Sequence, residues 1–405
     1  MADEKSQSLD AMETNGSHAE LERLSEHDDC IGALTRVSAL ASGVGAARGA
    51  LGVDLASPGA NAPLALNRVG QSLETSGLGP LLRALPIDPA LLANLMVLTL
   101  LATCLRTIRH GFGIDLVRPD ALPKLQAKVR SLSLGTSPTL RLPRVPAAGM
   151  ARMTALAGSA GALRAGLGVD LRQPGAGAML QGGVERMRAA GLSPALRAFP
   201  VGAATLGGLG SLVALTSGLG AMSAGLGVDP TKPQSAVRLE QLHAALRPNG
   251  ALSVVTAQLA SGSLGPGLAL PPPHVAAQLT GLRASVAATQ QNLGINLMAP
   301  NAGAQLQRMQ LALGRDGVCP AARGASVSAA DIDGVARLQA MASGCAAAAG
   351  AGVVAGAPDA HAALIRLVDG FHNSPAPDVV RSLSVRPAMI TQLAGLANVA
   401  SGAAG

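Results

Sequence analysis

One short phrase recurs six times along this chain, and it restricts the fold more than any other feature. It consists of an apolar residue, a glycine, a Val or Ile and an Asp or Asn, with a proline six residues after the glycine. The copies are LGVDLASP (51–58), FGIDLVRP (112–119), LGVDLRQP (167–174), LGVDPTKP (226–233), LGINLMAP (293–300) and a degenerate AGVVAGAP (351–358). Successive glycines are 61, 55, 59, 67 and 58 residues apart. A period in this range, kept six times, is typical of a tandem repeat array.

Each copy predicts a helical hairpin. A long stretch rich in Ala and Leu precedes the glycine, with apolar residues at steps of three and four, which predicts a helix. The glycine can end that helix in the left-handed conformation, and the Val or Ile can close a Schellman cap. The Asp or Asn can bond loop N–H groups, and the proline fits the first position of a second, shorter helix. The predicted cap residues are Gly52, Asp54, Pro58, Gly113, Asp115, Pro119, Gly168, Asp170, Pro174, Gly227, Asp229, Pro233, Gly294, Asn296, Pro300, Gly352 and Pro358.

The flanks of the phrase keep the same register. A leucine stands six residues after every proline, which predicts one core position for each second helix; these residues are Leu64, Leu125, Leu180, Leu239, Leu306 and Leu364. A third element, P-x-L-R-x-[LF]-P, links each hairpin to the next, as in PLLRALP (80–86), PTLRLPR (138–144) and PALRAFP (194–200). Its prolines are compatible with a short helix or an extended strap. Its arginines, which we expect to brace the linker, are Arg83, Arg141 and Arg197.

Aromatic residues, which normally supply much of a protein core, are nearly absent. The chain has three Phe, no Trp and no Tyr, but 50 Gly. A glycine inside a helix costs about 0.5–1 kcal/mol relative to Ala, so we expect helix backbones to meet closely at such positions. The glycines predicted to form these contacts are Gly43, Gly45, Gly158, Gly161, Gly218, Gly220, Gly344 and Gly350.

Charge is divided unevenly along the chain. Residues 1–30 hold nine Asp or Glu and two cations, so they predict a disordered acidic tail, whereas the rest of the chain is strongly basic. Nucleic acid is not an expected partner, because single-strand binding depends on aromatic stacking and the arginines are spread evenly. The four cysteines are scattered without metal spacing, and we expect no disulfide among them. No signal peptide is visible, which predicts a cytoplasmic protein or one exported without a classical signal.

We find no pattern that predicts catalysis. H-E-x-x-H, G-x-S-x-G and P-loop patterns are absent from the sequence. The recurring aspartates are expected to cap loops rather than to bind a metal, because copy five has Asn296 and copy six has Val354 at that position. We therefore predict no enzyme, no catalytic, metal or cofactor-binding residue, no cofactor and no small-molecule substrate.

Membrane insertion is the main alternative. Residues 198–228 carry no charge and exceed the roughly 20 residues that span a bilayer. The equivalent helices of other copies carry arginines, for example Arg106 and Arg109, and no aromatic belt exists. A buried helix in a soluble array is therefore favoured over a constitutive span.

The sequence thus predicts an all-α, elongated, solenoid-like array in which each repeat contacts mainly its neighbours. The expected units are an acidic tail (1–30), repeats at 31–95, 96–149, 150–209, 210–275 and 276–331, and a degenerate sixth repeat with a C-terminal cap (332–405). The function expected is a non-enzymatic scaffold or assembly component that binds a protein or itself. Its signal-less, Arg-over-Lys, Ala/Gly-rich sequence suggests a link with a bacterial secretion or injection apparatus. The alternative function is a signal-less secreted protein that inserts Ala/Gly-rich helices into membranes.

Overall fold

The computed structural model of the chain is helical, and the all-α prediction is confirmed for the residues that it describes. No strand occurs among those residues. They are 16–55, 62–75, 78–85, 88–131, 147–227, 235–262, 273–297, 299–315, 317–354, 357, 359–374, 376–382 and 385–403.

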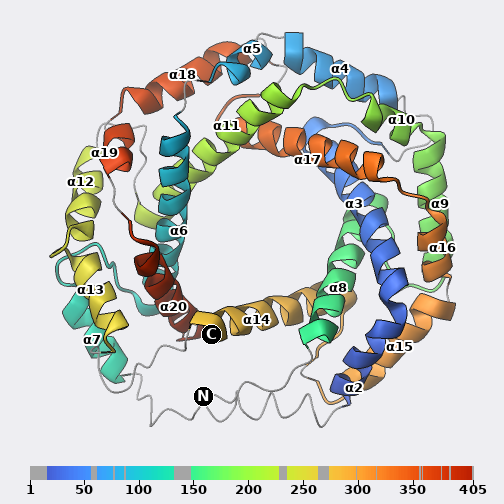
Figure 1. Ribbon diagram of the computed structural model, residues 1–405, viewed down its shortest axis with the longest axis horizontal. Helices are drawn as coiled ribbons and strands as arrows, with labels where there is room; N and C mark the ends of the chain where they lie inside the picture. Colours follow the sequence, from blue (N-terminus) through green and yellow to red (C-terminus); the bar gives the residue numbers. More distant parts are fainter. Residues whose placement is uncertain are drawn as a thin grey trace. The chain divides into compact units, whose positions relative to one another are not determined.

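The recurring phrase lies between a long helix and a medium one, and a short helix follows; we name these helices A, B and C (Figure 1). The A helices are α3 (Asp28–Leu51), α6 (Pro89–Phe112), α8 (Ala147–Leu167), α11 (Ala203–Ala221) with the π-helical turn η2 (Met222–Leu226), α14 (Pro273–Leu293) and α17 (Ala329–Gly350). The B helices are α4 (Ala62–Thr75), α7 (Ala121–Ser131), α9 (Ala176–Ala189), α12 (Ser235–Leu246), α15 (Ala302–Arg315) and α18 (Ala360–His372). The C helices are α5 (Leu78–Arg83), α10 (Leu192–Arg197), α13 (Ala251–Ala260), α16 (Val318–Gly324) and α19 (Ala376–Ser382).

The linker is therefore a short helix at the places where it is described. Pro80 and Pro194 lie in the first turns of α5 and α10, where the missing proline N–H leaves no helical hydrogen bond unmade. The segments 138–144 and 266–271, which carry two further copies of the linker, lie outside the described residues. The predicted repeat boundaries at 95, 149, 209, 275 and 331 each fall inside an A helix.

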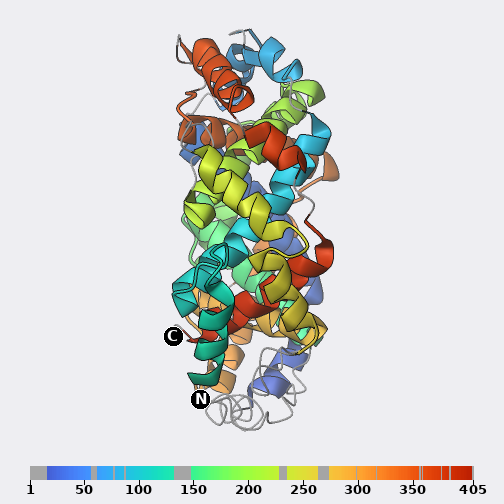
Figure 2. The same ribbon diagram turned by 90° about the vertical axis from the view of Figure 1, so that its left-hand side faces the viewer.

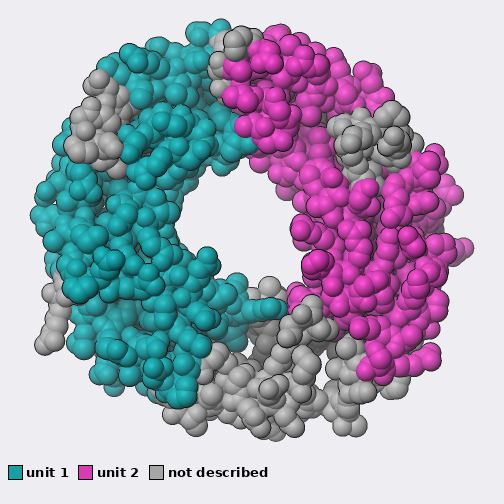
Figure 3. All heavy atoms as spheres, turned by 180° about the vertical axis from the view of Figure 1, so that it is seen from behind, with its two compact units in different colours: residues 1–76, 141–206, 279–346 teal, residues 77–140, 207–278, 347–405 magenta. Residues whose placement is uncertain are grey.

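Long-range contacts divide the chain into two compact units, which take alternate copies of the repeat (Figure 3). Unit 1 comprises residues 1–76, 141–206 and 279–346, and unit 2 comprises 77–140, 207–278 and 347–405. The cap glycines of copies one, three and five belong to unit 1, and those of copies two, four and six belong to unit 2.

Several contacts inside each unit join copies that are two repeats apart, and others, such as that of α3 with α16, join copies four repeats apart. In unit 1, α3 packs along α8, and in unit 2, α6 packs against η2. The predicted array, in which each repeat contacts mainly its neighbours along the chain, does not account for these contacts. A C-terminal helix, α20 (Pro387–Ala403), also packs along α6.

Glycines allow these paired helices to touch backbone to backbone. A Cβ atom built on Gly166 of α8 would overlap the carbonyl oxygen of Ala41 in α3. The same overlap would occur between Gly225 and Ala102, and between Gly111 and Ala400. Gly111, Gly166 and Gly225 all stand two residues before a cap glycine, so the close approach follows the repeat. Of the glycines predicted for this role, Gly43, Gly45, Gly161 and Gly218 meet atoms of another helix, whereas Gly158, Gly220 and Gly350 have open space around them.

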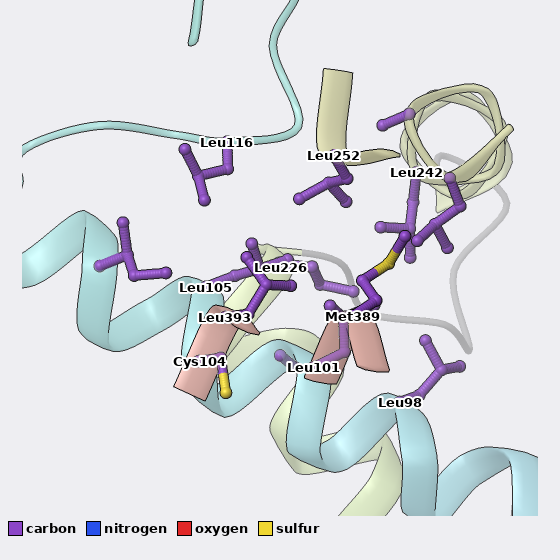
Figure 4. Packing of buried hydrophobic residues seen from close by; sticks show 14 of the residues in the cluster. Leu98, Leu101, Cys104, Leu105, Leu116, Leu226, Leu242, Leu252, Met389 and Leu393 are labelled. Atoms are coloured by element: carbon purple, nitrogen blue, oxygen red, sulfur yellow. The ribbon is translucent and has the colours of Figure 1, made fainter. Parts of the chain in front are cut away.

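The core of unit 2 is built mainly from aliphatic residues, and Phe112 and Phe371 are also buried in it. Leu98, Leu101 and Leu105 of α6 pack with Leu226 of η2, while α12, α13 and α20 supply further side chains (Figure 4). The labelled residues from those three helices are Leu242, Leu252, Met389 and Leu393.

The B helices bury one leucine at their fifth residue. Leu125, Leu180, Leu239 and Leu306 are fully buried there, as predicted. In copy one, the prediction of Leu64 is wrong, because Leu64 is 52% exposed and Leu66 is buried. Helix α4 begins four residues after its proline, whereas α7, α9 and α15 begin two residues after theirs, so the buried position moves by two.

The prediction of a disordered tail is wrong for residues 17–30. Helix α2 (Ser17–Arg23) and the 3₁₀ turn η1 (Leu24–His27) lead directly into α3. Leu21 and Leu24 are fully buried, and the backbone of Leu21 lies against Gly149 at the start of α8. Two leucines on one helical face thus outweigh the acidic composition around them. Residues 1–15 lie outside the described part of the chain.

The expectation of no disulfide is also wrong. Cys30 at the start of α3 is bonded to Cys319 of α16, across 289 residues of chain, and both residues are buried in unit 1. Scattered positions in the sequence say little about distance in space once the chain folds back on itself. Cys104 and Cys345 are free and buried.

The glycine contacts predict opposite effects for two substitutions in one helix. We expect Gly166→Ala to lower the free energy of unfolding by about 1–3 kcal/mol, because α8 must move away from α3. Gly158→Ala has open space and should raise it by about 0.5–1 kcal/mol through helix propensity. Urea denaturation followed by circular dichroism measures both, and equal stability of Gly166→Ala and wild type would rule out the close contact.

The disulfide predicts a dependence on reducing agent. Replacing Cys30 and Cys319 together by Ala should lower the free energy of unfolding by about 2–5 kcal/mol, since the bond closes a long loop. Wild type in reductant should approach the stability of this variant, and the variant itself should not respond to reductant. A wild-type melting temperature that is the same with and without reductant contradicts the prediction.

Candidate functional site

The six cap glycines lie at the ends of the A helices with left-handed backbones. Their φ angles are 66° (Gly52), 73° (Gly113), 70° (Gly168), 67° (Gly227), 69° (Gly294) and 82° (Gly352). The residue after the glycine is buried in the described copies, with Val53, Ile114, Val169, Ile295 and Val353 at most 8% exposed. In copy six, the N–H of Val353 donates to the carbonyl of Ala348 and that of Gly352 to Ala349, which is the bond pair of a Schellman cap. In copies one and three, the N–H groups of Val53 and Val169 donate to the carbonyl six residues earlier.

The recurring prolines lie in a turn ahead of helix B instead of at its first position. The N–H of Ala121 donates to the carbonyl of Arg118, which makes Pro119 the second residue of a four-residue turn. Proline is favoured there because its ring fixes φ near the value the turn needs. Ala176 and Ala302 make the same bond around Pro174 and Pro300. Pro58, Asp229, Pro233 and Pro358 lie outside the described residues.

The recurring aspartates bond to neighbouring groups in their own loops. Asp115 and Asp170 accept the N–H of the residue two positions later, at 3.2 and 3.0 Å. Asp170 also pairs with the Arg172 guanidinium, and Asp54 with Arg48 at 3.0 Å. The described residues contain no group of three or more His, Cys, Asp or Glu side chains that could hold a metal ion. Asn296, which replaces the aspartate in copy five, lies in the equivalent loop.

A second recurring residue, four positions before the cap glycine, connects alternate copies. Arg48 and Arg109 donate to the carbonyl oxygens of Gly166 and Ala224, at 3.4 and 3.2 Å. Arg164 donates to the side-chain oxygen of Asn292 at 3.4 Å. Each acceptor lies near the end of the A helix two repeats later, so these arginines reinforce the contact made by the glycines. The linker residue Arg197 similarly bonds Ser328 and the buried Asp331, both at 3.3 Å; Arg141 lies outside the described residues.

The two free cysteines that the structure describes are not activated as nucleophiles. Burial raises the pKa of the Cys345 thiol to about 11 and also raises the pKa of Cys104. Such thiols stay protonated at neutral pH, and the thiolate is the reactive form. Ser382 Oγ lies 3.4 Å from Nδ1 of the half-buried His243.

A strongly charged concave site lies in unit 2, beside the cap of copy two. We name it the basic pocket; it has a volume of about 310 Å³ and is lined by Arg109, Gly113, Asp115, Arg118, Asp120, Lys124 and Arg238. These residues come from the end of α6, the following loop, α7 and α12. Its four cations face two carboxylates.

Contacts inside the basic pocket hold its charges in place. Asp115 accepts Arg238 Nη2 at 3.2 Å and lies 3.7 Å from Arg118 Nε. Arg238 Nη1 also donates to Gln241 at 3.0 Å. Lys124 lies 2.6 Å from Asp120 and lowers the pKa of that carboxyl. Arg118 and Lys124 remain more than half exposed.

The sequence prediction missed this pocket, although a signal for it exists. Five and eleven residues after the cap glycine, copy two has Arg118 and Lys124. Copy four has Lys232 and Arg238 at the same positions. The other copies carry no cation there; their residues are Ser57, Pro63, Gln173, Met179, Ala299, Gln305, Ala357 and Ala363. A comparison of what differs between copies, in addition to what recurs, identifies these positions.

Helix α6 also presents an exposed apolar face. Met96 and Leu100, one turn apart, are 62% and 56% exposed. The hydroxyls of Thr99 and Thr103 donate to carbonyls within the helix, and no charge occurs between Asp88 and Arg106. By length and composition, three segments of the described chain could cross a membrane: Ser17–Leu51, Ala90–Phe112 and Ala203–Leu226.

No family model, no curated protein and no solved structure matches this chain.

The Asp170–Arg172 pair predicts a pH dependence of stability. The Arg172 guanidinium holds the pKa of Asp170 at about 2, below its usual 3.8. A carboxyl with a lowered pKa contributes stability above its unfolded pKa, and that contribution is lost as pH falls from about 4 to about 2. Wild type should therefore lose more stability over this window than Asp170→Asn, which resembles copy five. Parallel pH profiles of the two melting temperatures would contradict the prediction.

Proposed function

We propose that this chain is a non-enzymatic interaction scaffold built on tandem helical repeats. The observation that carries the proposal is a difference between two sets of residues. Those that recur in the copies form caps, bury side chains or join alternate copies. Those that distinguish the copies include exposed cations and apolar side chains. Repeat proteins commonly use a constant framework to present variable surface residues to partners.

A protein partner, or a second copy of the chain, is the proposed ligand of the exposed face of α6. Met96 and Leu100 offer an apolar stripe without charge, which suits the apolar face of another helix. The proposal includes no catalytic step and no cofactor.

The disulfide supports an exported location over a cytoplasmic one. Disulfides form and persist mainly in oxidising compartments. Cys30 and Cys319 are both buried in the folded unit, so their bond belongs to the folded state. We propose export without a classical signal peptide, and the connection to a secretion or injection apparatus remains part of this proposal.

Site-specific crosslinking tests the scaffold function. A photo-crosslinking amino acid at Met96 should give a discrete covalent adduct with one protein in the native source, or with a second copy. The same amino acid at Gly158, an exposed helical position in unit 1, is the matched control. Identical adduct patterns from both positions, or lipid adducts alone from Met96, would contradict the proposal.

Membrane insertion is the second candidate, and the three long apolar segments favour it. If it holds, the chain should float with liposomes, and residues 203–221 should become protected from protease. A chain that stays in the aqueous fraction and is cleaved at the same rate with and without liposomes rules this candidate out.

A further inference from the structure

We propose that the basic pocket of unit 2 binds a phosphoryl group. This inference is independent of the scaffold proposal, since it concerns a small anionic ligand. It begins with the repeat itself. Arg109 and Asp115 have counterparts in other copies, Arg48 with Asp54 and Arg164 with Asp170, and so follow from the framework.

Arg118, Lys124 and Arg238 are additional to that framework. Copies one, three, five and six have a helix B but no cation at either position. The fold therefore does not need these charges. Packing of alternate copies brings the copy-four cation, Arg238, to the loop of copy two, where Arg118 and Lys124 already lie. Three cations that the fold does not require thus meet in one concavity.

The charge balance of the pocket fits a doubly charged anion. Arg109, Arg118, Lys124 and Arg238 supply four positive charges, and Asp115 and Asp120 supply two negative ones. The remaining two positive charges match a phosphoryl group, which carries about −1.5 to −2 at neutral pH and offers several acceptor oxygens. Guanidinium groups bind such oxygens in pairs, with strong charge-assisted hydrogen bonds.

The carboxylates of the pocket preorganise the cations without occupying all their donors. Arg238 is fixed by both Asp115 and Gln241. Arg118 lies 3.7 Å from Asp115 and is 62% exposed, so it can turn toward a ligand. Lys124 is 56% exposed and has two further donor hydrogens besides the one facing Asp120.

A groove that adjoins the basic pocket suggests what kind of molecule could carry the phosphoryl group. It has a volume of about 520 Å³, shares Arg118 and Arg238, and continues along Val117, Pro119, Ala244 and Ala245. Helices α12 and α13 form its far side; α13 also contacts α7, and Figure 2 shows these helices from the side. An apolar lining next to the cations is compatible with a lipid phosphate, whereas free phosphate would use the basic pocket alone.

Binding of pyrophosphate and of vesicles tests the proposal on the full-length chain. Calorimetry with pyrophosphate measures binding of a free phosphate compound. Flotation with phosphatidylcholine vesicles, with and without phosphatidic acid, measures binding of a lipid phosphate. We expect binding in at least one arm. Arg118→Gln with Lys124→Gln should weaken it roughly tenfold or more, because charge-assisted hydrogen bonds are lost.

The matched control is Arg36→Gln with Arg188→Gln, which removes the same charge from exposed positions of unit 1. This control should bind as wild type does. Asp120→Asn should bind more tightly, because it releases Lys124 and raises the pocket charge; this second variant keeps the test valid if the double variant is unstable. The proposal is overturned if neither ligand binds, if pocket and control variants weaken binding equally, or if Asp120→Asn binds no better than wild type.

Discussion

The structure depends on helix backbones that touch at glycine, between copies of the repeat that are two apart. Gly166 against Ala41 and Gly225 against Ala102 place two A helices closer than any side chain would allow. Dispersion contacts fall off steeply with distance, so this approach gains packing that a core without Trp or Tyr could not obtain otherwise. The arginines four residues before the caps then use the free carbonyls at the helix ends. Removing the glycine contact would therefore also remove these hydrogen bonds.

The contact between α20 and α6 extends the same geometry to the end of the chain. Ala400 meets Gly111 as Ala41 meets Gly166, although α20 carries no recognisable copy of the recurring phrase. An A-type helix can thus be present without its cap, since the packing position depends on small residues along the helix. The recurring phrase marks where an A helix ends. The glycine two residues before the cap glycine marks where the backbone of another helix contacts it.

The contacts between alternate copies of the repeat also explain where a binding site could arise. Residues at equivalent positions of copies two and four come together, so a change in one even-numbered copy is placed beside a change in another. The basic pocket arises in this way from Arg118, Lys124 and Arg238. Arg109 and Gly113 also line this pocket, but they belong to the framework, because Arg48 with Gly52 and Arg164 with Gly168 occupy the same positions in copies one and three. The additional charges therefore lie at positions that neither the glycine caps nor the glycine contacts use.

The sequence by itself determined the long helices, their glycine caps and the buried leucine of the B helices in copies two to six. These features depend on the glycine conformation, on side chains three or four residues apart and on nearby hydrogen bonds, all of which are local in the chain. The sequence did not show which copies touch, that Cys30 meets Cys319, that Leu66 replaces Leu64, or that residues 17–30 are helical. Only the tertiary structure decided these, because they depend on distances between segments more than 100 residues apart or on a turn two residues longer. A repeat specifies the local structure of each copy, whereas the contacts between copies depend on packing between segments that are far apart in the chain.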